Sequence, residues 1–347
     1  MTDAPLLSVR SLTTSFRTDN GMVTAVDDVS FDIRAGETVG IVGESGCGKT
    51  VTSKSIMRLL PEHVTRYGEK SEVLFGGRNL LRASASEMRK VRGDQIAMIF
   101  QEPMTSLNPV FRIGWQLDEA LKYHTKLGKS ERRDRAIEML RLVEIPEPER
   151  RYREYPHQLS GGMRQRVMIA IALACSPDLL IADEPTTALD VTIQAQILAL
   201  MNDIKTKMNS AIMLITHDLG VVAQVCDRVI VMYAGRVIEQ ATVGDIFKRP
   251  RHPYTKALLE SIPKRGDRKT RGRKLATIPG IVPSLTQLPP GCRFETRCKR
   301  SDKDRCINEE PALVENAEGR RCRCHYPLDG APPPNAAPVV STSGGEA

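Results

Sequence analysis

An eight-residue segment, GESGCGKT at Gly43–Thr50, restricts the fold of this chain more than any other. Glycine loses more conformational freedom on folding than any other residue, so three glycines here imply a backbone path that other residues avoid. The β-branched run TVGIVG at 38–43 leads into the segment, and TVTSKSIMRLLP, a helical pattern stopped by Pro61, follows it. A strand, a glycine-rich loop and a helix in this order predict a phosphate-binding loop.

In such a loop, backbone N–H groups and the helix N-terminus surround phosphate oxygens. We expect Lys49 to place its charge at the β and γ phosphates and Thr50 to offer its hydroxyl to Mg²⁺. Cys47 is interpreted as a small filler rather than a redox switch. The predicted nucleotide-binding residues of this loop are Gly43, Glu44, Ser45, Gly46, Cys47, Gly48, Lys49, Thr50 and Val51.

The rest of the first 262 residues alternates between strand and helix patterns. Apolar strands are predicted at 95–100, 179–183 and 211–216, and a hairpin from Arg228 with its turn at Ala234–Gly235. Helical periodicity covers 115–142 and 191–208, while 103–158 carries no strand signal and is interpreted as a helical insert. Alternating strands and helices predict an α/β fold with a largely parallel sheet.

Four polar residues follow these strands at their carboxyl ends, where ligands of open parallel sheets bind. Asp183 ends the apolar run LLIAD and is predicted to hold Mg²⁺, and Glu184 is predicted to orient or deprotonate the attacking water. Gln101 is predicted to reach Mg²⁺ or the water, and His217 to donate to the γ-phosphate. A helix-capping role for the acidic pair is the weaker alternative.

The remaining composition is that of an ordinary globular protein, with 41% hydrophobic and 27% charged residues. The longest apolar run, at 167–175, is too short to span a membrane, and residues 1–10 are mixed and polar, so we expect a cytosolic chain. The net charge is +8, and the basic run KRGDRKTRGRK at 264–274 is interpreted as a solvated linker, with contact to lipid headgroups or nucleic acid as the alternative. Residues 331–347 are expected to be disordered.

The eight cysteines are distributed unevenly. Three are scattered before residue 227, and five lie between 292 and 324. Cytosolic proteins rarely use disulfides, so this group predicts metal or redox chemistry. Four thiolates can hold zinc or a four-iron cluster, and the close C-x-x-C pairs typical of zinc are absent.

The segment LSGGMRQRVMIAIALACSPDLLIADEPTTALD at 159–190 resembles the block from signature to acidic pair in ATP-binding cassette (ABC) ATPases. The resemblance covers roughly residues 7–263; Met163 stands where the general signature has Gln and matches a variant common in peptide importers. It implies a phosphate-loop NTPase fold with a RecA-like core, an antiparallel β subdomain and a helical subdomain at about 103–165.

The resemblance also implies a mechanism. Two cassettes would sandwich two ATP molecules, each bound between the phosphate loop of one subunit and the signature of the other. Ser160, Gly161 and Gly162 would contact the γ-phosphate, Phe16 would stack on adenine, and Asp190 would communicate across the dimer. Gln101 and the helical insert would receive a coupling helix of a membrane subunit.

The C-terminal part narrows the resemblance to the dipeptide and oligopeptide importer ATPases. The segments RHPYTKALLESIP, IPGIVPSL and GCRFETRC carry this likeness, and 263–330 is interpreted as a C-terminal extension following a nucleotide-binding domain at 1–262. In this subfamily the extension is associated with a [4Fe–4S] cluster, which predicts Cys292, Cys298, Cys306 and Cys324 as ligands, with Cys322 as a competing ligand and Zn²⁺ as the alternative. The implied partners are a second, paralogous ATPase subunit, two transmembrane permease subunits and an extracytoplasmic peptide-binding protein, with no nucleic acid.

Two other classes of ABC ATPase fit the sequence less well. Chromosome and repair ATPases usually insert a long coiled coil between loop and signature, whereas about 110 residues without long heptads separate them here. Ribosome-acting proteins usually carry tandem cassettes, and this chain has one. Nickel, glutathione and sugar-peptide compounds stay open as alternative substrates of an importer.

Overall fold

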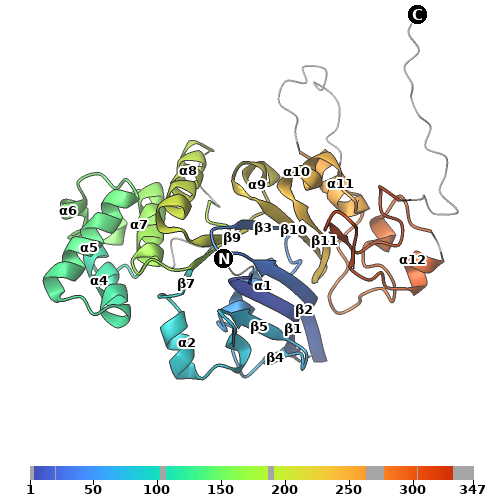
Figure 1. The fold of residues 1–347 in the computed structure, drawn as a ribbon, viewed down its shortest axis with the longest axis horizontal. Helices are drawn as coiled ribbons and strands as arrows, with labels where there is room; N and C mark the ends of the chain where they lie inside the picture. The colour runs from blue at the N-terminus through green and yellow to red at the C-terminus, as the bar shows by residue number, and fades with distance from the viewer. Residues whose placement is uncertain are drawn as a thin grey trace, which may run out of the picture.

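The computed structural model describes residues 4–19, 21–101, 107–186, 191–262, 277–302 and 304–330. The basic run at 264–274, Asp190 and the segment 331–347 lie outside the described residues. Two sheets and a group of helices make up the described chain (Figure 1). Helices α4 to α7 lie at one end of the molecule, and the C-terminal region with α12 (Arg305–Asn308) lies at the other (Figure 1).

The main sheet has eight strands in the order β12-β13-β11-β10-β3-β9-β8-β7. The five strands from β10 to β7 are parallel, as the alternating pattern predicted, and β11, β13 and β12 add antiparallel strands at one edge. The strands are β3 (Thr38–Val42), β7 (Ile96–Ile99), β8 (Leu179–Asp183), β9 (Ala211–Ile215), β10 (Arg228–Tyr233), β11 (Arg236–Thr242), β12 (Val314–Glu315) and β13 (Arg321–Cys322).

The central strands are apolar throughout because both faces of the sheet are covered. Successive side chains of a strand point to opposite faces. On β8, Leu179 and Ile181 therefore join the core beneath the second sheet, while Leu180 and Ala182 join the core formed with the helices. This burial on both faces explains the uninterrupted apolar runs in the sequence, which predicted the strands.

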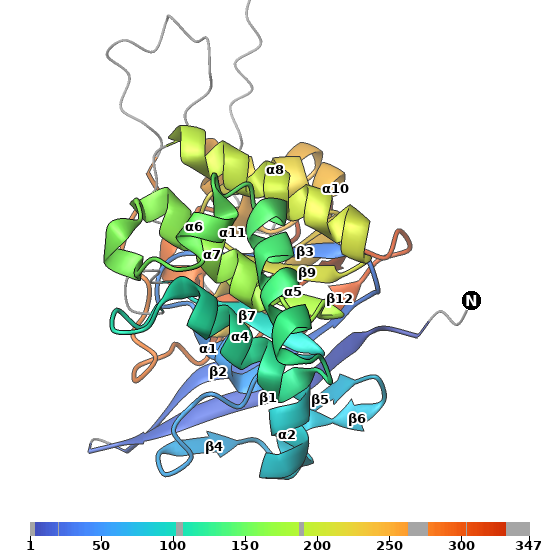
Figure 2. The ribbon, with the colours of Figure 1, turned by 90° about the vertical axis from the view of Figure 1, so that its left-hand side faces the viewer.

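The second sheet is antiparallel and lies against one face of the main sheet (Figure 2). Its order is β2-β1-β5-β6, with β4 also paired to β1. Its strands are β1 (Leu7–Thr18), β2 (Gly21–Ile33), β4 (Thr65–Tyr67), β5 (Glu72–Phe75) and β6 (Arg78–Asn79), and α2 (Ala85–Val91) follows them.

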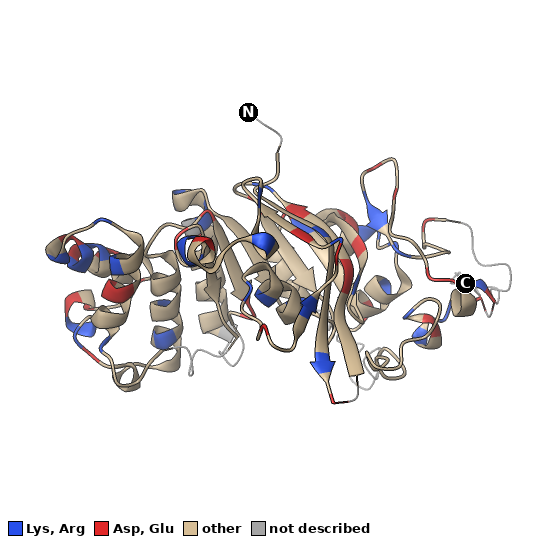
Figure 3. Ribbon diagram, turned by 90° about the horizontal axis from the view of Figure 1, so that it is seen from below, with Lys and Arg blue, Asp and Glu red and all other residues tan. Residues whose placement is uncertain are grey.

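The other helices are α1 (Lys49–Ile56), α4 (Ile113–His124), α5 (Lys129–Leu142), α6 (Pro148–Arg151), α7 (Gly161–Leu173), α8 (Val191–Met208), α9 (Leu219–Val225), α10 (Val243–Lys248) and α11 (Pro253–Glu260). The helical periodicity predicted at 115–142 is divided between α4 and α5, because the chain is extended at Thr125 and Gly128. Charged residues of both signs are frequent on the helical end of the molecule and sparse on the central strands (Figure 3). None of the helices in the described part of the chain is both long enough and apolar enough to cross a bilayer.

Helix α1 ends four residues before the position that its sequence pattern indicated. Arg58 takes a left-handed conformation (φ 48°), its N–H donates to Ser55 O, and Leu59 N donates to Lys54 O. These two bonds form a Schellman motif, which satisfies the last carbonyl groups of the helix. The side chain of Arg58 also donates to Ala83 O, which ties this unusual turn to the segment before α2.

The β10–β11 hairpin matches its prediction. Ala234 and Gly235 both have positive φ angles, 43° and 84°, as a two-residue turn of this hand requires. Gly235 N donates to Cys47 O at 3.0 Å, and Asp27 N donates to Gly235 O at 2.9 Å. The hairpin turn is therefore a direct neighbour of the glycine-rich loop.

His252 makes the stability of the fold depend on pH. It precedes α11, its Nδ1 accepts a hydrogen bond from Tyr254 N at 3.0 Å, and burial lowers the pKa of its imidazole from 6.5 to about 3. Between these two values the unfolded chain binds a proton that the folded chain does not, so stability falls as the pH drops below about 6.5.

We expect the unfolding free energy to lose up to about 1.4 kcal/mol per pH unit between pH 6 and 4 from this one residue. The substitution His252→Asn keeps a helix-capping acceptor and removes the titration. Denaturant unfolding at several pH values should give a shallower pH slope for the variant. Equal slopes for the two proteins would contradict the assignment.

Candidate functional site

The glycine-rich loop joins β3 to α1, and two of its positions exclude every residue except glycine. Gly43 and Gly48 have φ angles of 155° and 99°. A Cβ atom on Gly43 would lie 2.3 Å from Met232 O, and one on Gly48 would lie 2.7 Å from Ala25 O. The loop is thus pressed against β10 and β2, which explains why the sequence places glycine at these two points.

Lys49 begins α1 and is nearly buried. Its Nζ donates to Gly43 O at 2.8 Å and to Glu44 O at 3.1 Å, so the ammonium group sits inside the curl of the loop. No side chain caps the N-terminus of α1, which leaves its first N–H groups available to an anion. Cys47 is buried, and burial raises the pKa of its thiol, which disfavours the reactive thiolate.

Thr50 and Asp183 are brought together from α1 and the end of β8. Thr50 Oγ1 donates to Asp183 Oδ1 at 3.2 Å, although 133 residues separate them. Asp183 is 1% exposed, and burial raises the pKa of its carboxyl. A hydroxyl and a carboxylate are the hard oxygen ligands that Mg²⁺ prefers, so this pair fits a magnesium ion chemically.

Glu184 meets the two other predicted catalytic residues. Its Oε2 accepts a hydrogen bond from Gln101 Nε2 at 3.1 Å, and its Oε1 lies 3.3 Å from His217 Nδ1. The carboxylate is mostly sheltered, with 15% of the side chain exposed, whereas 66% of the His217 side chain is exposed. The backbone of Glu184 has a φ angle of 48°, a conformation that costs free energy in a residue other than glycine and is frequent at functional sites.

The order of the strands explains this convergence. Strands β3, β9, β8 and β7 are neighbours and run parallel, so their carboxyl ends share one edge of the sheet. The loop follows β3, His217 follows β9, the acidic pair ends β8, and Gln101 follows β7. The structure therefore gathers at one edge the residues that the sequence selected by their position after apolar strands.

The remaining predicted nucleotide-binding residues lie elsewhere. Ser160 caps α7, its hydroxyl accepting from Met163 N at 3.3 Å, and Gly161 and Gly162 open that helix. Phe16 lies on β1 opposite Val23 and Thr65. The signature residues thus belong to the helical end of the molecule and Phe16 to the antiparallel sheet (Figure 1).

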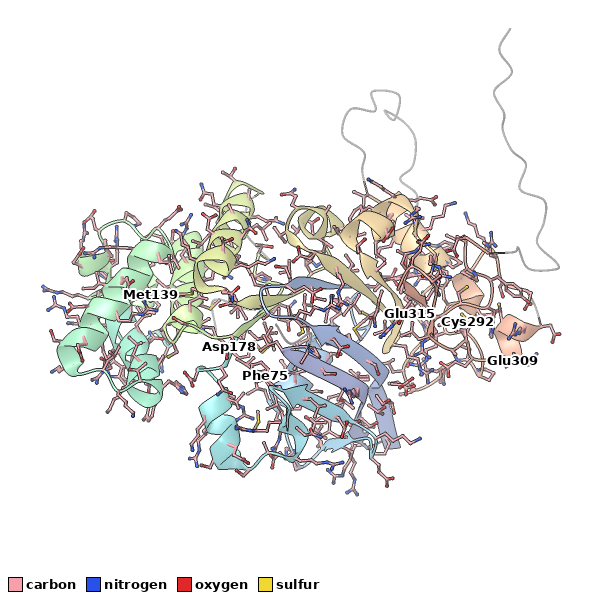
Figure 4. The ribbon with its side chains drawn as sticks, viewed as in Figure 1. Phe75, Met139, Asp178, Cys292, Glu309 and Glu315 are labelled. Carbon is pink, nitrogen blue, oxygen red and sulfur yellow. The ribbon has the colours of Figure 1, made fainter. Side chains whose placement is uncertain are left out.

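The prediction of an iron–sulfur cluster is wrong. Cys292, Cys298, Cys306 and Cys324 line one small pocket, at the end of the molecule opposite Met139 (Cys292 and Met139 are labelled in Figure 4). Within the described ranges, however, no group of three or more His, Cys, Asp or Glu side chains is arranged to hold a metal ion. Burial raises the pKa of the Cys292 and Cys324 thiols to about 12, so both thiols are neutral in this pocket. Their spacing in the sequence indicates that the cysteines lie near one another, but not whether their sulfur atoms converge on one metal position.

Sequence reasoning missed two side chains that hold the glycine-rich loop from behind. Tyr254 Oη accepts a hydrogen bond from Glu44 N at 3.0 Å, and Arg297 forms an ion pair with the Glu44 carboxylate. Tyr254 lies in the segment RHPYTKALLESIP and Arg297 in the segment GCRFETRC. In the sequence, these segments indicated only the resemblance to peptide importer ATPases. Their distance from Glu44 along the chain left no local pattern that could pair them.

The fold and this site together define a phosphate-loop nucleotide-binding cassette. Two families match the chain: "ABC transporter" over residues 26–187 and "Oligopeptide/dipeptide transporter, C-terminal region" over residues 238–306. The chain is 56% identical over 319 residues to a probable peptide ABC transporter ATP-binding protein of Sinorhizobium fredii, which covers 92% of this chain and 94% of that protein. It is 52% identical over 326 residues to the dipeptide transport ATP-binding protein DppD of Escherichia coli, covering 94% and 98%.

Solved structures agree. A dimeric bacterial ABC transporter cassette matches with a TM-score of 0.61 and 30% identity, covering 68% of this chain and 98% of that one. A dimeric cassette in a post-hydrolysis state, bound to ADP and Pi, matches with a TM-score of 0.61 and 29% identity over the same shares. The chain belongs to the ABC transporter ATP-binding proteins, in the group that carries the oligopeptide/dipeptide C-terminal region. Its enzymatic activity is ATP hydrolysis, with ATP and Mg²⁺ as the ligands of the site; the relatives are described as ATP-binding transport proteins, not as iron–sulfur proteins.

Proposed function

We propose that this chain is the ATP-hydrolysing subunit of an importer for dipeptides or oligopeptides. The observation that carries the proposal is the meeting of Thr50 with Asp183, and of Glu184 with Gln101 and His217, at the sheet edge beside the glycine-rich loop. The peptide part rests on relatives that are named as dipeptide and oligopeptide transport proteins and match nearly the whole chain.

Each residue of the loop has a proposed task. The backbone of Gly43–Thr50 and Val51 surrounds the phosphates, and Lys49 exchanges its bonds to Gly43 O and Glu44 O for phosphate oxygens. Thr50 and Asp183 would hold Mg²⁺, which supplies positive charge where the phosphates accumulate negative charge, and Gln101 is a further candidate ligand.

Glu184 is proposed as the general base. Its carboxylate is sheltered, sits next to Asp183 and is oriented by hydrogen bonds from two sides. Such a carboxylate can take a proton from a water that attacks the γ-phosphate. Gln101 would position that water, and His217, which is more exposed than Glu184, would donate to the γ-phosphate.

A second cassette would complete the site. Ser160, Gly161 and Gly162 start helix α7, where free N–H groups suit an anion, yet they belong to the helical end of the molecule. The signature would therefore act on ATP bound to another subunit, with Asp190 at the contact and Phe16 against adenine. The solved neighbours support this arrangement in that both are described as dimeric.

An apolar groove between core and helical insert suits a membrane subunit. Met57, Leu59, Phe100, Leu107, Met168 and Ile171 are among the residues that line it. Phe100 directly precedes Gln101, so a coupling helix docked in this groove would be linked to the catalytic edge. This contact would hold the subunit at the cytoplasmic face of the membrane, against two permease subunits and beside a second, paralogous ATPase. The peptide-binding protein would act on the opposite side of the membrane.

The proposal predicts ATP hydrolysis that responds to peptide. In proteoliposomes carrying the complete transporter, peptide-loaded binding protein should raise the ATPase rate severalfold, and empty binding protein should not. Nickel, glutathione and a sugar-peptide conjugate serve as competing ligands, and stimulation by one of these alone would replace peptide as the substrate. Stimulation by DNA or ribosomes, with none by any solute, would contradict a role in import.

A further inference from the structure

An arginine of the C-terminal segment (residues 277–330) contacts the glycine-rich loop. Arg297, which ends the short 3₁₀ turn Glu295–Arg297, forms a bidentate ion pair with Glu44: one guanidinium nitrogen lies 2.7 Å from Oε2 and the other 3.0 Å from Oε1. Only 4% of the Arg297 side chain is exposed, against 27% for Glu44. A two-pronged pair with a buried arginine fixes both geometry and charge.

The other donors of Arg297 are also used. Its Nε donates to Pro279 O at 2.9 Å, and Nη1 donates to Tyr233 Oη at 3.2 Å. The guanidinium also lies 5.8 Å from the centre of the Tyr233 ring, within cation–π range. The side chain is therefore held in one place by groups that take no part in catalysis. Through its ion pair, it fixes the position of the Glu44 carboxylate.

A second arginine of the same segment supports the loop from its other end. Arg293 donates through Nη1 to Ala234 O at 2.5 Å and pairs with Asp27. Ala234 belongs to the hairpin turn whose Gly235 N–H bonds to Cys47 O. The segment that carries Arg293 and Arg297 thus holds the loop at Glu44 directly and at Cys47 through the turn.

We propose that Arg297 is a positioning residue for ATP binding, through which the C-terminal segment sets the affinity of the phosphate loop. A loop with three glycines loses much freedom when it closes on phosphates, and prior anchoring of Glu44 reduces that loss. The pair also neutralises a carboxylate that would otherwise stand unpaired beside a polyphosphate and repel it. Glu44 then holds the loop in the conformation that binds the phosphates.

The test uses the full-length chain with Arg297→Met. We expect the Kd for MgADP, measured by titration calorimetry, and the KM for ATP to rise about tenfold, since the substitution removes the cation paired with the half-buried Glu44 carboxylate and leaves that charge uncompensated. The kcat should stay within about twofold, because Gln101, Glu184 and His217 are untouched. Arg305→Met is the matched control: this arginine is in the same segment and pairs with exposed Glu309, so neither constant should change.

Two further variants test the same role of Arg297 if Arg297→Met folds poorly. Arg297→Lys retains the charge and loses the fork, and should raise the Kd about threefold. Glu44→Gln combined with Arg297→Met removes both charges and should recover part of the lost affinity. A lowered Tm with unchanged Kd and KM in Arg297→Met or Arg297→Lys would reduce Arg297 to a structural contact and overturn the proposal, as would equal losses in the Arg305→Met control.

Discussion

Replacing Glu184 by glutamine is expected to stop ATP turnover while ATP binding persists. Glutamine has nearly the same shape but accepts no proton at neutral pH, so hydrolysis should fall by at least about 100-fold. Its amide can still accept from Gln101 and meet a ring nitrogen of His217, which preserves the geometry seen around the carboxylate. Steady-state phosphate release and equilibrium binding of ATP measure the two effects separately.

The same variant should accumulate the closed, ATP-bound pair of cassettes. Size-exclusion chromatography with ATP should show a larger species that dissolves when ATP is removed. Glu138→Gln is a matched control, because Glu138 is an exposed carboxylate of α5 that pairs with Arg135. Undiminished hydrolysis by Glu184→Gln would remove Glu184 from the role of general base.

Replacing Lys49 by alanine is expected to weaken ATP binding strongly. The ammonium group is buried inside the loop and held by Gly43 O and Glu44 O, so its loss takes away the charge nearest the phosphates. Hydrogen bonds to charged groups contribute about 1.5–3 kcal/mol, which corresponds to a rise in Kd of roughly 10- to 150-fold. Calorimetric titration with MgADP measures it.

Lys129→Ala provides the comparison for Lys49→Ala. Lys129 is an exposed lysine at the start of α5, in the helical insert, and its removal changes the net charge by the same amount. Its Kd should equal that of the unaltered chain. An unchanged Kd in Lys49→Ala would mean that the phosphates bind elsewhere.

The convergence of the candidate site residues could be predicted because local sequence patterns indicate their positions. Gln101 and His217 follow, and Asp183 ends, a strand that is apolar on both faces, and parallel neighbours bring such strand ends together. The glycine-rich loop can also be recognised from local sequence, because the close approach of Met232 O leaves no room for a side chain at Gly43. Chemistry and position are here encoded within a few residues of each other.

What could not be predicted depends on contacts between distant segments. The pair between Glu44 and Arg297 spans 253 positions, and neither residue stands in a periodic pattern that would indicate the other. The pairing of β13 with β11 carries the main sheet past residue 262, where composition alone suggested a separate extension. The iron–sulfur prediction was wrong because cysteine spacing indicates which thiols lie near one another, but not whether their sulfur atoms converge on one point.

The central claim is that ATP bound at Gly43–Thr50 drives movement of a peptide through a membrane subunit, and peptide uptake tests it most directly. Proteoliposomes with the complete transporter, ATP at the face that carries this subunit, and a labelled dipeptide on its binding protein should accumulate the label. With ATP held near the Kd of the unaltered subunit, uptake should fall to nearly the ATP-free background when this subunit carries Lys49→Ala and should be unchanged with Lys129→Ala. Uptake that continues at the original rate in the Lys49→Ala transporter would contradict the central claim.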